Sequence, residues 1–453
     1  MLLGVLLCIM VSLAASETRT RGSSTMRARQ CRLDQLTSSQ PNQKIRSEGG
    51  TIEVWDEEED QFQCAGVAAM RVTVQPDSLS LPSYYSSPRL VYVEQGEGVF
   101  GLSLPGCPET YQSRGMEMRG DEEEEEGFES GRRMTDAHQP TRRVRKGDVV
   151  ALPQGTVHWC FNDGQEDLVV VAVHNLNTDA NQLDQSLKTF FLAGGVQGGS
   201  KEGKSQKLNF NNILSAFETK LLAEALGTEE ETVRKMQESD ERGPIVKARK
   251  NMRQMVTPPR FGREQDEDET NGLEESFCNM RFRHNLGPRT EADIASRQAG
   301  RIHSVDQNKL PILEFIDMSA EKGHLLPNAM LAPAWPLSGH RVFYVLRGEA
   351  QMQIVDDNGQ TVLDDRVSEG SMVVIPQFYI STCRAGRDGL EYVSFETTAN
   401  PMSSPLNGHA SVFKGMPIPV LSNSYQISPR AAYELKQTRS HEHGLFSPFG
   451  GRS

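Results

Sequence analysis

The chain lacks several features that point to common classes of function. Beyond its first sixteen residues it has no apolar run of about 18 residues or more, so no segment suggests a membrane-spanning helix. Positive charge is not in excess, since 48 Lys and Arg against 61 Asp and Glu give a net charge of −13, which argues against nucleic acid as a partner. The chain has no Gly-rich phosphate loop of the Walker type and no Gly-x-Ser-x-Gly elbow. We therefore expect neither a nucleotide site nor that type of serine nucleophile.

Cysteine is also sparse. Six cysteines follow residue 16, and none of them has the close paired spacing of a zinc site. Residues 1–16 differ from the rest, because the apolar run Leu2–Met10 is followed by the small residues Ala14, Ala15 and Ser16. This pattern is typical of a secretory signal peptide, although no Lys or Arg precedes the apolar run. In a secreted protein the remaining cysteines can form disulfides.

The dipeptide Asn271-Gly272 stands in an unusual setting. It follows the acidic run Asp266–Glu269 and precedes Cys278 by only a few residues. An acidic, Gly-bearing stretch cannot bury enough apolar surface to order itself, so we expect an exposed linker that proteases can reach. A cysteine shortly after the cut holds the two pieces together if it forms a disulfide. The sequence thus predicts a precursor that is cut and stays assembled.

The chain contains one pattern twice. Residues 91–98 resemble residues 343–350, and residues 144–153 resemble residues 367–376. Each copy reads as short strands separated by Gly and Pro turns, which predicts an antiparallel sandwich or barrel. The first copy carries an insert between residue 105 and about residue 140, with the acidic run 121–126. Adjacent like charges repel, so we expect a solvated surface loop; binding of cations and keeping the protein dispersed stay open as roles for it.

Helical patterns follow each β-rich block. The apolar residues between Ile213 and Leu226 fall on one helical face, and Thr228 has the capping-box spacing to Glu231, which predicts a second short helix. In the second half, Ser428 before Pro429 predicts the start of another helix. Whether these apolar faces pack on their own barrel or on a neighbouring subunit stays open.

The motif that names a family lies in the first repeat. Gly147, Pro153, Gly155, His158 and Asn162 match the second cupin motif at every fixed position. Two such blocks resemble a bicupin, which implies a mainly β fold of two jelly-roll β-barrels, each followed by a short helical extension. Residues 271–278 resemble the processing junction of 11S globulins, the legumin-type seed storage proteins. The resemblance extends from about residue 31 to about residue 436.

This resemblance implies a division of the chain and a course of maturation. The signal peptide is 1–16, the N-terminal cupin domain 17–245, the acidic linker with the processing site 246–271, and the C-terminal cupin domain 272–453. An asparaginyl endopeptidase is expected to cut after Asn271, leaving two disulfide-linked chains that form homotrimers and then hexamers. The family pattern pairs Cys31 with Cys64 and Cys107 with Cys278. The route is the secretory pathway to the protein storage vacuole.

One feature departs from the family pattern. Family members usually have a basic second chain, whereas residues 272–453 carry 17 Lys and Arg against 19 Asp and Glu, a net charge of −2. Charge attraction between the two chains is therefore a weak argument for their staying together.

The two other cysteines occupy equivalent positions. Cys160 lies seven residues after Pro153, and Cys383 lies seven after Pro376. Cys160 also has the same parity along its strand as His158, so both should face the barrel interior. We expect two free, inert thiols, each buried in its own barrel and unable to meet the other.

Metal-dependent cupins use two His and a Glu from the first motif and a His from the second. Here the Glu positions hold Arg89 and Arg341, and the His positions fall in Pro82–Tyr85 and in 334–337, which contain no histidine. The second motif keeps His158, but the other repeat has Ser381. A catalytic divalent ion needs about three protein ligands, so we expect His158 to be a core histidine with a hydrogen-bonded ring.

These residues favour a storage protein with no cofactor, no metal and no catalytic site. Two alternatives stay open: a metal-dependent bicupin enzyme of the oxalate-degrading type, and a bicupin that binds a small ligand such as a sugar.

Overall fold

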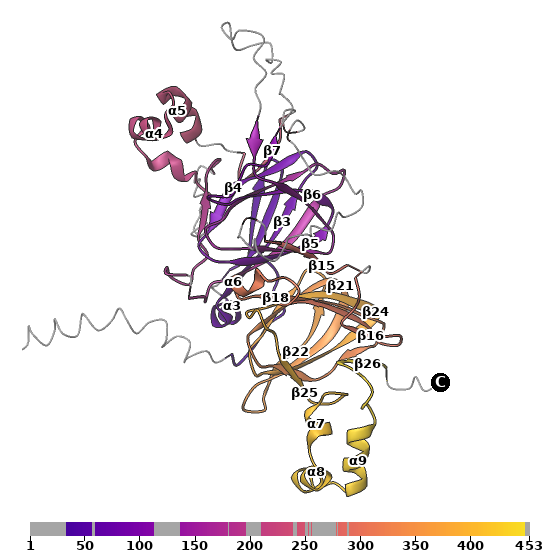
Figure 1. Ribbon diagram of the computed structural model, residues 1–453. Coiled ribbons are helices and arrows are strands. Elements are labelled where there is room, and N and C mark those ends of the chain that lie inside the picture. The colour runs from indigo at the N-terminus through magenta and orange to yellow at the C-terminus, as the bar shows by residue number, and fades with distance from the viewer. Residues whose placement is uncertain are drawn as a thin grey trace, which may run out of the picture.

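The computed structural model describes residues 33–56, 59–112, 136–179, 181–195, 210–238, 242–249, 252, 255, 278, 280–287 and 290–448. The expected signal peptide, the acidic run 121–126 and the Asn271-Gly272 junction lie outside these described residues. The described part is mostly antiparallel β-sheet and forms two barrels, one above the other in Figure 1. The predicted bicupin architecture is confirmed.

Two facing sheets build the first barrel, and every strand pair in them is antiparallel. The first sheet runs in the order β1 (Gln43–Ser47), β2 (Gly50–Trp55), β3 (Val67–Val74), β12 (Leu168–Asn175), β5 (Arg89–Gln95), β10 (Asp148–Leu152) and β15 (Arg283–Asn285). The second runs in the order β13 (Thr189–Phe191), β4 (Ser78–Tyr85), β11 (Val157–Asn162), β6 (Glu97–Ser103) and β9 (Thr141–Arg145), with β14 (Ile245–Lys247) also on β4. The hairpin β7 (Tyr111–Gln112) and β8 (Ala137–His138) brackets the insert, and helix α3 (Asp60–Ala65) connects β2 to β3.

The second barrel repeats this plan with longer strands. Its sheet contains β16 (Ile294–Ser296), β17 (Gly300–Val305), β18 (Ser319–Leu325), β19 (Met330–Leu331), β20 (Ala334–Pro336), β21 (Arg341–Val355), β22 (Thr361–Ser368), β23 (Met372–Ile375), β24 (Ile380–Glu396), β25 (Ser403–Pro405) and β26 (Leu445–Phe446). Strands β21 and β24 pair along most of their length, and register shifts near Gly348 bend the pair around the barrel.

The glycines of the repeat explain why the pattern recurs. Gly96 has φ 79° and Gly348 has φ 81°, in the left-handed region that favours glycine. A Cβ on Gly348 would lie 2.3 Å from the carbonyl oxygen of Gly389, and a Cβ on Gly96 would lie 2.5 Å from that of Asp167. Both positions therefore require glycine, at Gly96 where the chain passes from β5 in one sheet to β6 in the other, and at Gly348 where the continuous strand β21 bends.

A helical arm follows each barrel, and Figure 1 shows the two arms at opposite ends of the molecule. The first contains the 3-10 turn η1 (Ile213–Ala216), α4 (Thr219–Leu226) and α5 (Glu230–Gln237). The second contains α7 (Val412–Gly415), α8 (Ile418–Tyr425) and α9 (Pro429–Gln437). A short helix, α6 (Leu313–Ile316), lies in the second barrel between β17 and β18.

The helix starts were predicted with mixed success. Ser428 caps α9 as expected, since its hydroxyl accepts a hydrogen bond of 3.1 Å from the Ala431 N–H. The capping box at Thr228 was wrong, because Glu229 is the N-cap of α5 and its side chain makes no capping bond. Thr228 is instead used to close α4: its N–H donates to the Ala223 carbonyl at 3.1 Å, just after Gly227 turns the chain with φ 64°.

Each half of the chain also lends a segment to the other barrel. Leu33 and Leu36 pack in the core of the second barrel, and the Leu36 N–H donates to the Val362 carbonyl at 2.8 Å. In return, β15 extends the first sheet by pairing with β10, and Phe282, 1% exposed, lies in the core of the first barrel. The sequence did not predict this exchange. After a cut in the linker, each of the two chains would therefore still contribute a segment to the barrel of the other chain.

Candidate functional site: the two barrel interiors and the junction

The fixed residues of the cupin motif hold turns rather than face an open site. Gly147 turns the chain with φ 91° and Gly155 with φ 69°. Asn162 is fully buried, and its amide donates to the carbonyls of Val74 at 2.7 Å and Glu166 at 2.8 Å. Its side-chain oxygen accepts from the Gly164 N–H at 2.9 Å. These bonds fix the end of β11 and so position His158 at the start of the same strand.

His158 points into the first barrel and is 8% exposed. Its Nε2 is hydrogen bonded to Arg89, and its Nδ1 lies 3.2 Å from the Thr156 carbonyl oxygen. Tyr85 stacks on the His158 ring at 5.7 Å between centroids, and the Arg89 guanidinium lies 4.1 Å from the Tyr85 ring centre. His174, directly across the sheet from Arg89, completes the group. The interior of the first barrel is thus filled by aromatic rings around one guanidinium.

Burial sets the charge state of this cluster. Desolvation, followed by the positive charge of Arg89, holds the pKa of His158 well below its usual value, and the same two causes lower the pKa of His174. Both imidazoles are therefore neutral at pH 7, and the His158 Nε2 can accept a hydrogen bond from the Arg89 guanidinium. Among the described residues no carboxylate forms an ion pair with Arg89.

In the second barrel the buried guanidinium is paired with carboxylates. Arg341, the counterpart of Arg89, donates from Nη2 to Glu396 Oε1 at 2.7 Å and lies 3.9 Å from Glu321 Oε1 through Nη1. Glu396 pairs with Arg341 across the sheet at the position that His174 holds in the first barrel. Glu321 also accepts from the Tyr392 hydroxyl at 2.6 Å. A guanidinium therefore occupies the Glu position of the metal motif in both barrels.

Neither interior offers a donor set of the metal-binding type. Within the residues that the structure describes, no group of three or more His, Cys, Asp or Glu side chains is placed to hold a metal ion. His158, the one motif histidine, has both ring nitrogens engaged by Arg89 and Thr156. The arginines and His158 thus make buried polar contacts within the barrels.

The two free cysteines differ in burial. Cys383 is 1% exposed, as expected, but Cys160 is only half-buried and packs at the edge of the first core. The expectation of full burial was wrong for Cys160, although β11 keeps its register with β6 from Val157 to Phe161 and the side chains alternate regularly along it. Desolvation raises the pKa of both thiols to about 12, so neither is a thiolate at pH 7.

The junction between the halves is held by a disulfide. Cys107 is bonded to Cys278, the pairing that the family pattern implied. The Gln139 amide donates to the Cys107 carbonyl at 3.1 Å and anchors that loop. Cys64 is also in a disulfide, but its expected partner Cys31 lies outside the described residues.

Beyond the disulfide, a buried carboxylate anchors β15. Asp148 is 0% exposed and lies 3.1 Å from the Arg283 guanidinium. It also accepts from the Asn285 amide at 2.7 Å and from the Arg145 N–H at 2.8 Å. Three donors thus satisfy one buried acid, and two of them, Arg283 and Asn285, come from the other half of the chain.

Among the described helices, none is long and apolar enough to cross a membrane.

Comparison with known proteins gives one consistent result. The cupin family profile matches residues 36–197 and 286–432. The 11S globulin seed storage protein 2 of Sesamum indicum is 48% identical over 456 residues, covering 100% of this chain and 99% of that protein. The 13S globulin seed storage protein of Fagopyrum tataricum is 40% identical, covering 93% of this chain and 88% of its own length. The crystal structure of coconut cocosin superposes with a TM-score of 0.79 at 37% identity, covering 92% of this chain and all of that one.

Proposed function

Since this chain belongs to the 11S seed storage globulins of the cupin superfamily, we propose that it is a nutrient reservoir that is cut after Asn271 and stays assembled. One observation carries this proposal: the disulfide Cys107–Cys278 links the regions on either side of the Asn271-Gly272 junction. A protein stockpiled for later digestion has to survive its first cut as a compact body. The covalent link and the exchanged segments both serve that end.

A gel with and without reductant, followed by N-terminal sequencing, tests this proposal. Mature protein should run as one species without reductant and as two with it, and the smaller chain should begin at Gly272. The Cys278→Ser variant should separate into two chains on a denaturing gel even without reductant. Two chains in unreduced wild-type protein, or a second chain that starts elsewhere, would contradict the proposal.

We propose further that the protein is not an enzyme. Guanidinium groups occupy the Glu positions of the metal motif in both barrels, and the histidine position of the second motif holds Ser381 in the second barrel. Turnover of oxalate by protein dialysed against manganese would favour the metal-dependent alternative instead. We expect no turnover above that of the buffer.

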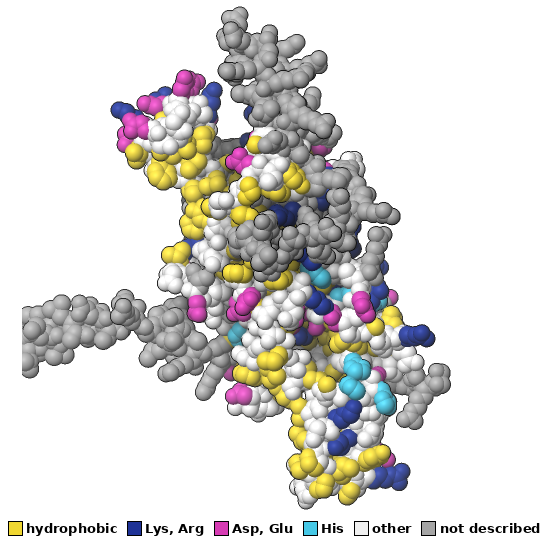
Figure 2. All heavy atoms as spheres, viewed as in Figure 1, with side chains coloured by type: hydrophobic (Ala, Val, Ile, Leu, Met, Phe, Trp, Pro, Cys, Tyr) yellow, Lys and Arg dark blue, Asp and Glu magenta, His cyan; other side chains and the backbone are white. Residues whose placement is uncertain are grey.

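We also propose that the two arms join neighbouring copies into a homotrimer. Exposed apolar side chains cluster on both arms: Phe217, Leu221 and Leu226 on the first, and Val420, Tyr425 and Tyr433 on the second, each at least 47% exposed. Figure 2 shows hydrophobic side chains over both arms. Contacts between the first arm of one copy and the second arm of the next are head-to-tail, so three copies can close a ring.

Native mass spectrometry tests the trimer with a matched pair of variants. Leu221→Glu places a charge in the proposed contact and should release monomers. Lys220→Glu changes an adjacent exposed residue of the same helix and should leave trimers. Trimers of unchanged stability in Leu221→Glu would rule out this surface. Stacking of two cut trimers into a hexamer, after an asparaginyl endopeptidase has acted in the storage vacuole, completes the proposed maturation.

A further inference from the structure

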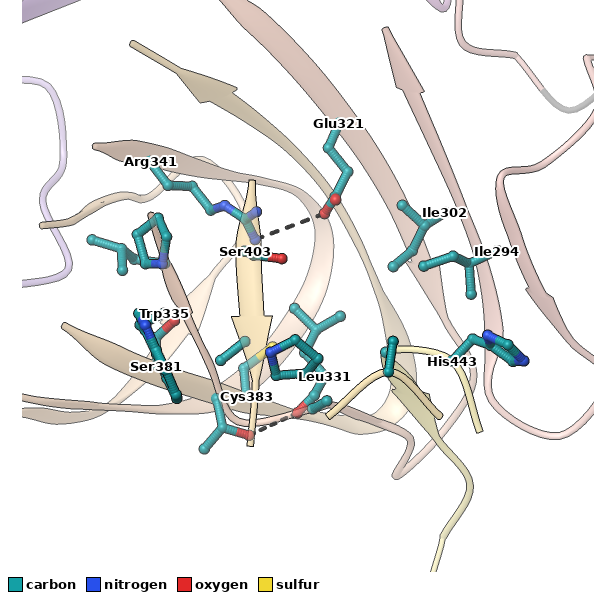
Figure 3. Close-up of a pocket in the computed structure, with 18 of the residues that line it drawn as sticks. Ile294, Ile302, Glu321, Leu331, Trp335, Arg341, Ser381, Cys383, Ser403 and His443 are labelled. Atoms are coloured by element: carbon teal, nitrogen blue, oxygen red, sulfur yellow. Dashed lines mark hydrogen bonds and ion pairs between the residues drawn. The ribbon is translucent and has the colours of Figure 1, made fainter. Parts of the chain in front are cut away.

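A cavity of about 590 Å³ lies inside the second barrel, at the end nearest the C-terminal arm. Its size is typical of pockets that hold small molecules. Figure 3 shows Arg341 and Glu321 on one side of the space, and Trp335, Ser381 and Cys383 on another. Most of the wall is apolar, with Ile302, Leu331, Trp335, Phe343, Met352 and Ile375 among the lining side chains.

The cavity exists because equivalent positions carry smaller or more flexible side chains than in the first barrel. Ser381 pairs with Ile354 across the sheet, as His158 pairs with Leu102, so a hydroxymethyl group replaces an imidazole ring. Four residues after the repeat glycine, Met352 stands where the first barrel has Phe100. In the first barrel those two rings lie 6.3 Å apart and fill the interior. Their replacement leaves the space open in the second.

One polar group facing this space has an unused donor. The Arg341 Nε is buried and has no hydrogen-bond acceptor among the described residues, although its Nη2 is bonded to Glu396. A buried N–H without an acceptor is costly, and a ligand oxygen would relieve that cost. The Arg341 guanidinium is paired with Glu396 at 2.7 Å and lies 3.9 Å from Glu321, so its charge is already balanced and an anion gains nothing by entering.

We propose that this cavity binds a small, neutral, largely apolar molecule whose carbonyl oxygen accepts a hydrogen bond from the Arg341 Nε–H. The apolar walls supply affinity through buried surface, and the single donor selects ligands that carry an oxygen acceptor. This site is independent of the storage role.

Two probes of the same shape test the assignment by equilibrium dialysis with the full-length protein. They are 1-acetonaphthone and 1-isopropenylnaphthalene, which has a CH2 group in place of the carbonyl oxygen. We expect one molecule of either probe per chain. The Arg341→Lys variant keeps the positive charge but lacks the Nε donor, so it should weaken binding of acetonaphthone about tenfold while leaving that of the hydrocarbon unchanged.

Two further variants test the place of binding. Ser381→Phe fills the cavity and should abolish binding of both probes; Ala334→Leu, a smaller change in the same wall, should weaken both. His158→Gln, at the equivalent position of the first barrel, should bind both as wild type does. Thermal melts establish that each variant is folded.

Three results would overturn the proposal. They are a folded wild-type protein that binds neither probe, cavity-filling variants that bind as well as wild type, and an Arg341→Lys variant that weakens both probes equally. The last result would leave an apolar pocket without the assigned acceptor contact.

Discussion

The exchange of segments between the two halves leads to a prediction about the cut protein. After cleavage in the linker and reduction of Cys107–Cys278, the two chains should remain together in native buffer. The reason is that β15 belongs to the second chain but completes a sheet of the first barrel. The Leu33–Leu36 segment does the reverse in the second barrel. Size-exclusion chromatography of cut, reduced protein should therefore show one species, whereas a denaturing gel shows two chains.

Phe282 is the residue with which to measure this contribution. It is 1% exposed in the core of the first barrel, and its carbonyl accepts from the Ala151 N–H at 2.8 Å. Truncating a buried Phe to Ala costs roughly 3–5 kcal/mol because it removes apolar burial and leaves a cavity. If this loss falls on chain association, the affinity of the two chains falls about a hundredfold or more.

The assay is urea titration of cut, reduced protein, following chain separation by size-exclusion chromatography. Phe282→Ala should separate at markedly lower urea than wild type. Phe315→Ala is the matched control, because Phe315 is 60% exposed in α6 and its truncation removes little buried surface. Equal midpoints for the two variants would refute the reasoning, and so would wild-type chains that part on reduction alone in native buffer.

Three other changes have defined outcomes. Asn271→Gln should leave an uncut precursor that is still trimeric, and hexamers of normal abundance on native mass spectrometry would contradict this. The pKa values of His158 and His174 are both lowered by burial and by the neighbouring guanidinium, so below about pH 6.5 only the unfolded state gains these protons. Each histidine should make stability fall by about 1.4 kcal/mol for each unit of falling pH, and His158→Gln should reduce the slope in urea unfolding by about that amount. Gly348→Ala should destabilise the protein by more than about 1–2 kcal/mol, since its φ is 81° and a Cβ would meet the Gly389 carbonyl at 2.3 Å. The control is Gly359→Ala, which has φ 71° and open space around it, so thermal melts should show only the cost of placing a Cβ on left-handed backbone.

The features that the sequence predicted are those encoded by local pattern. Gly96 and Gly348 mark equivalent strand turns because left-handed backbone restricts the residue at each one, so the repeat could be recognised without a structure. Ser428 before a proline likewise predicts a helix start, because the capping contact lies within one turn. The arginines at positions 89 and 341 were identified by counting from those same glycines.

The features that were missed depend on contacts between distant segments. Strand β15 has three residues, too few to display a period, and what places it is the pairing with β10 and the buried Asp148. Cys160 is only half-buried although side chains alternate regularly along β11, so a count of alternating residues gives the face of a side chain but not its degree of burial. Neither the cavity nor the Glu321 and Glu396 contacts of Arg341 could be predicted, because both depend on three-dimensional packing across the sheet.

The two arginines should respond to the same substitution in opposite ways. Arg341→Met leaves Glu321 and Glu396 beside an apolar side chain, and removing one partner from a buried ion pair costs roughly 3–5 kcal/mol. Arg89→Met removes a buried cation whose described neighbours are the neutral His158 and Tyr85, so it strands no charge.

Arg89→Met also removes the free-energy cost of burying a charged guanidinium. We therefore expect Arg89→Met to cost much less than Arg341→Met, or to stabilise the protein, in urea unfolding at pH 7. Similar losses for both variants would show that carboxylate pairing is not what distinguishes the two interiors. The expected asymmetry means that arginine has different roles at the same position of the repeat. Arg341 belongs to an ion-pair cluster in the second barrel, whereas Arg89 fills space in the first barrel and an apolar side chain can replace it.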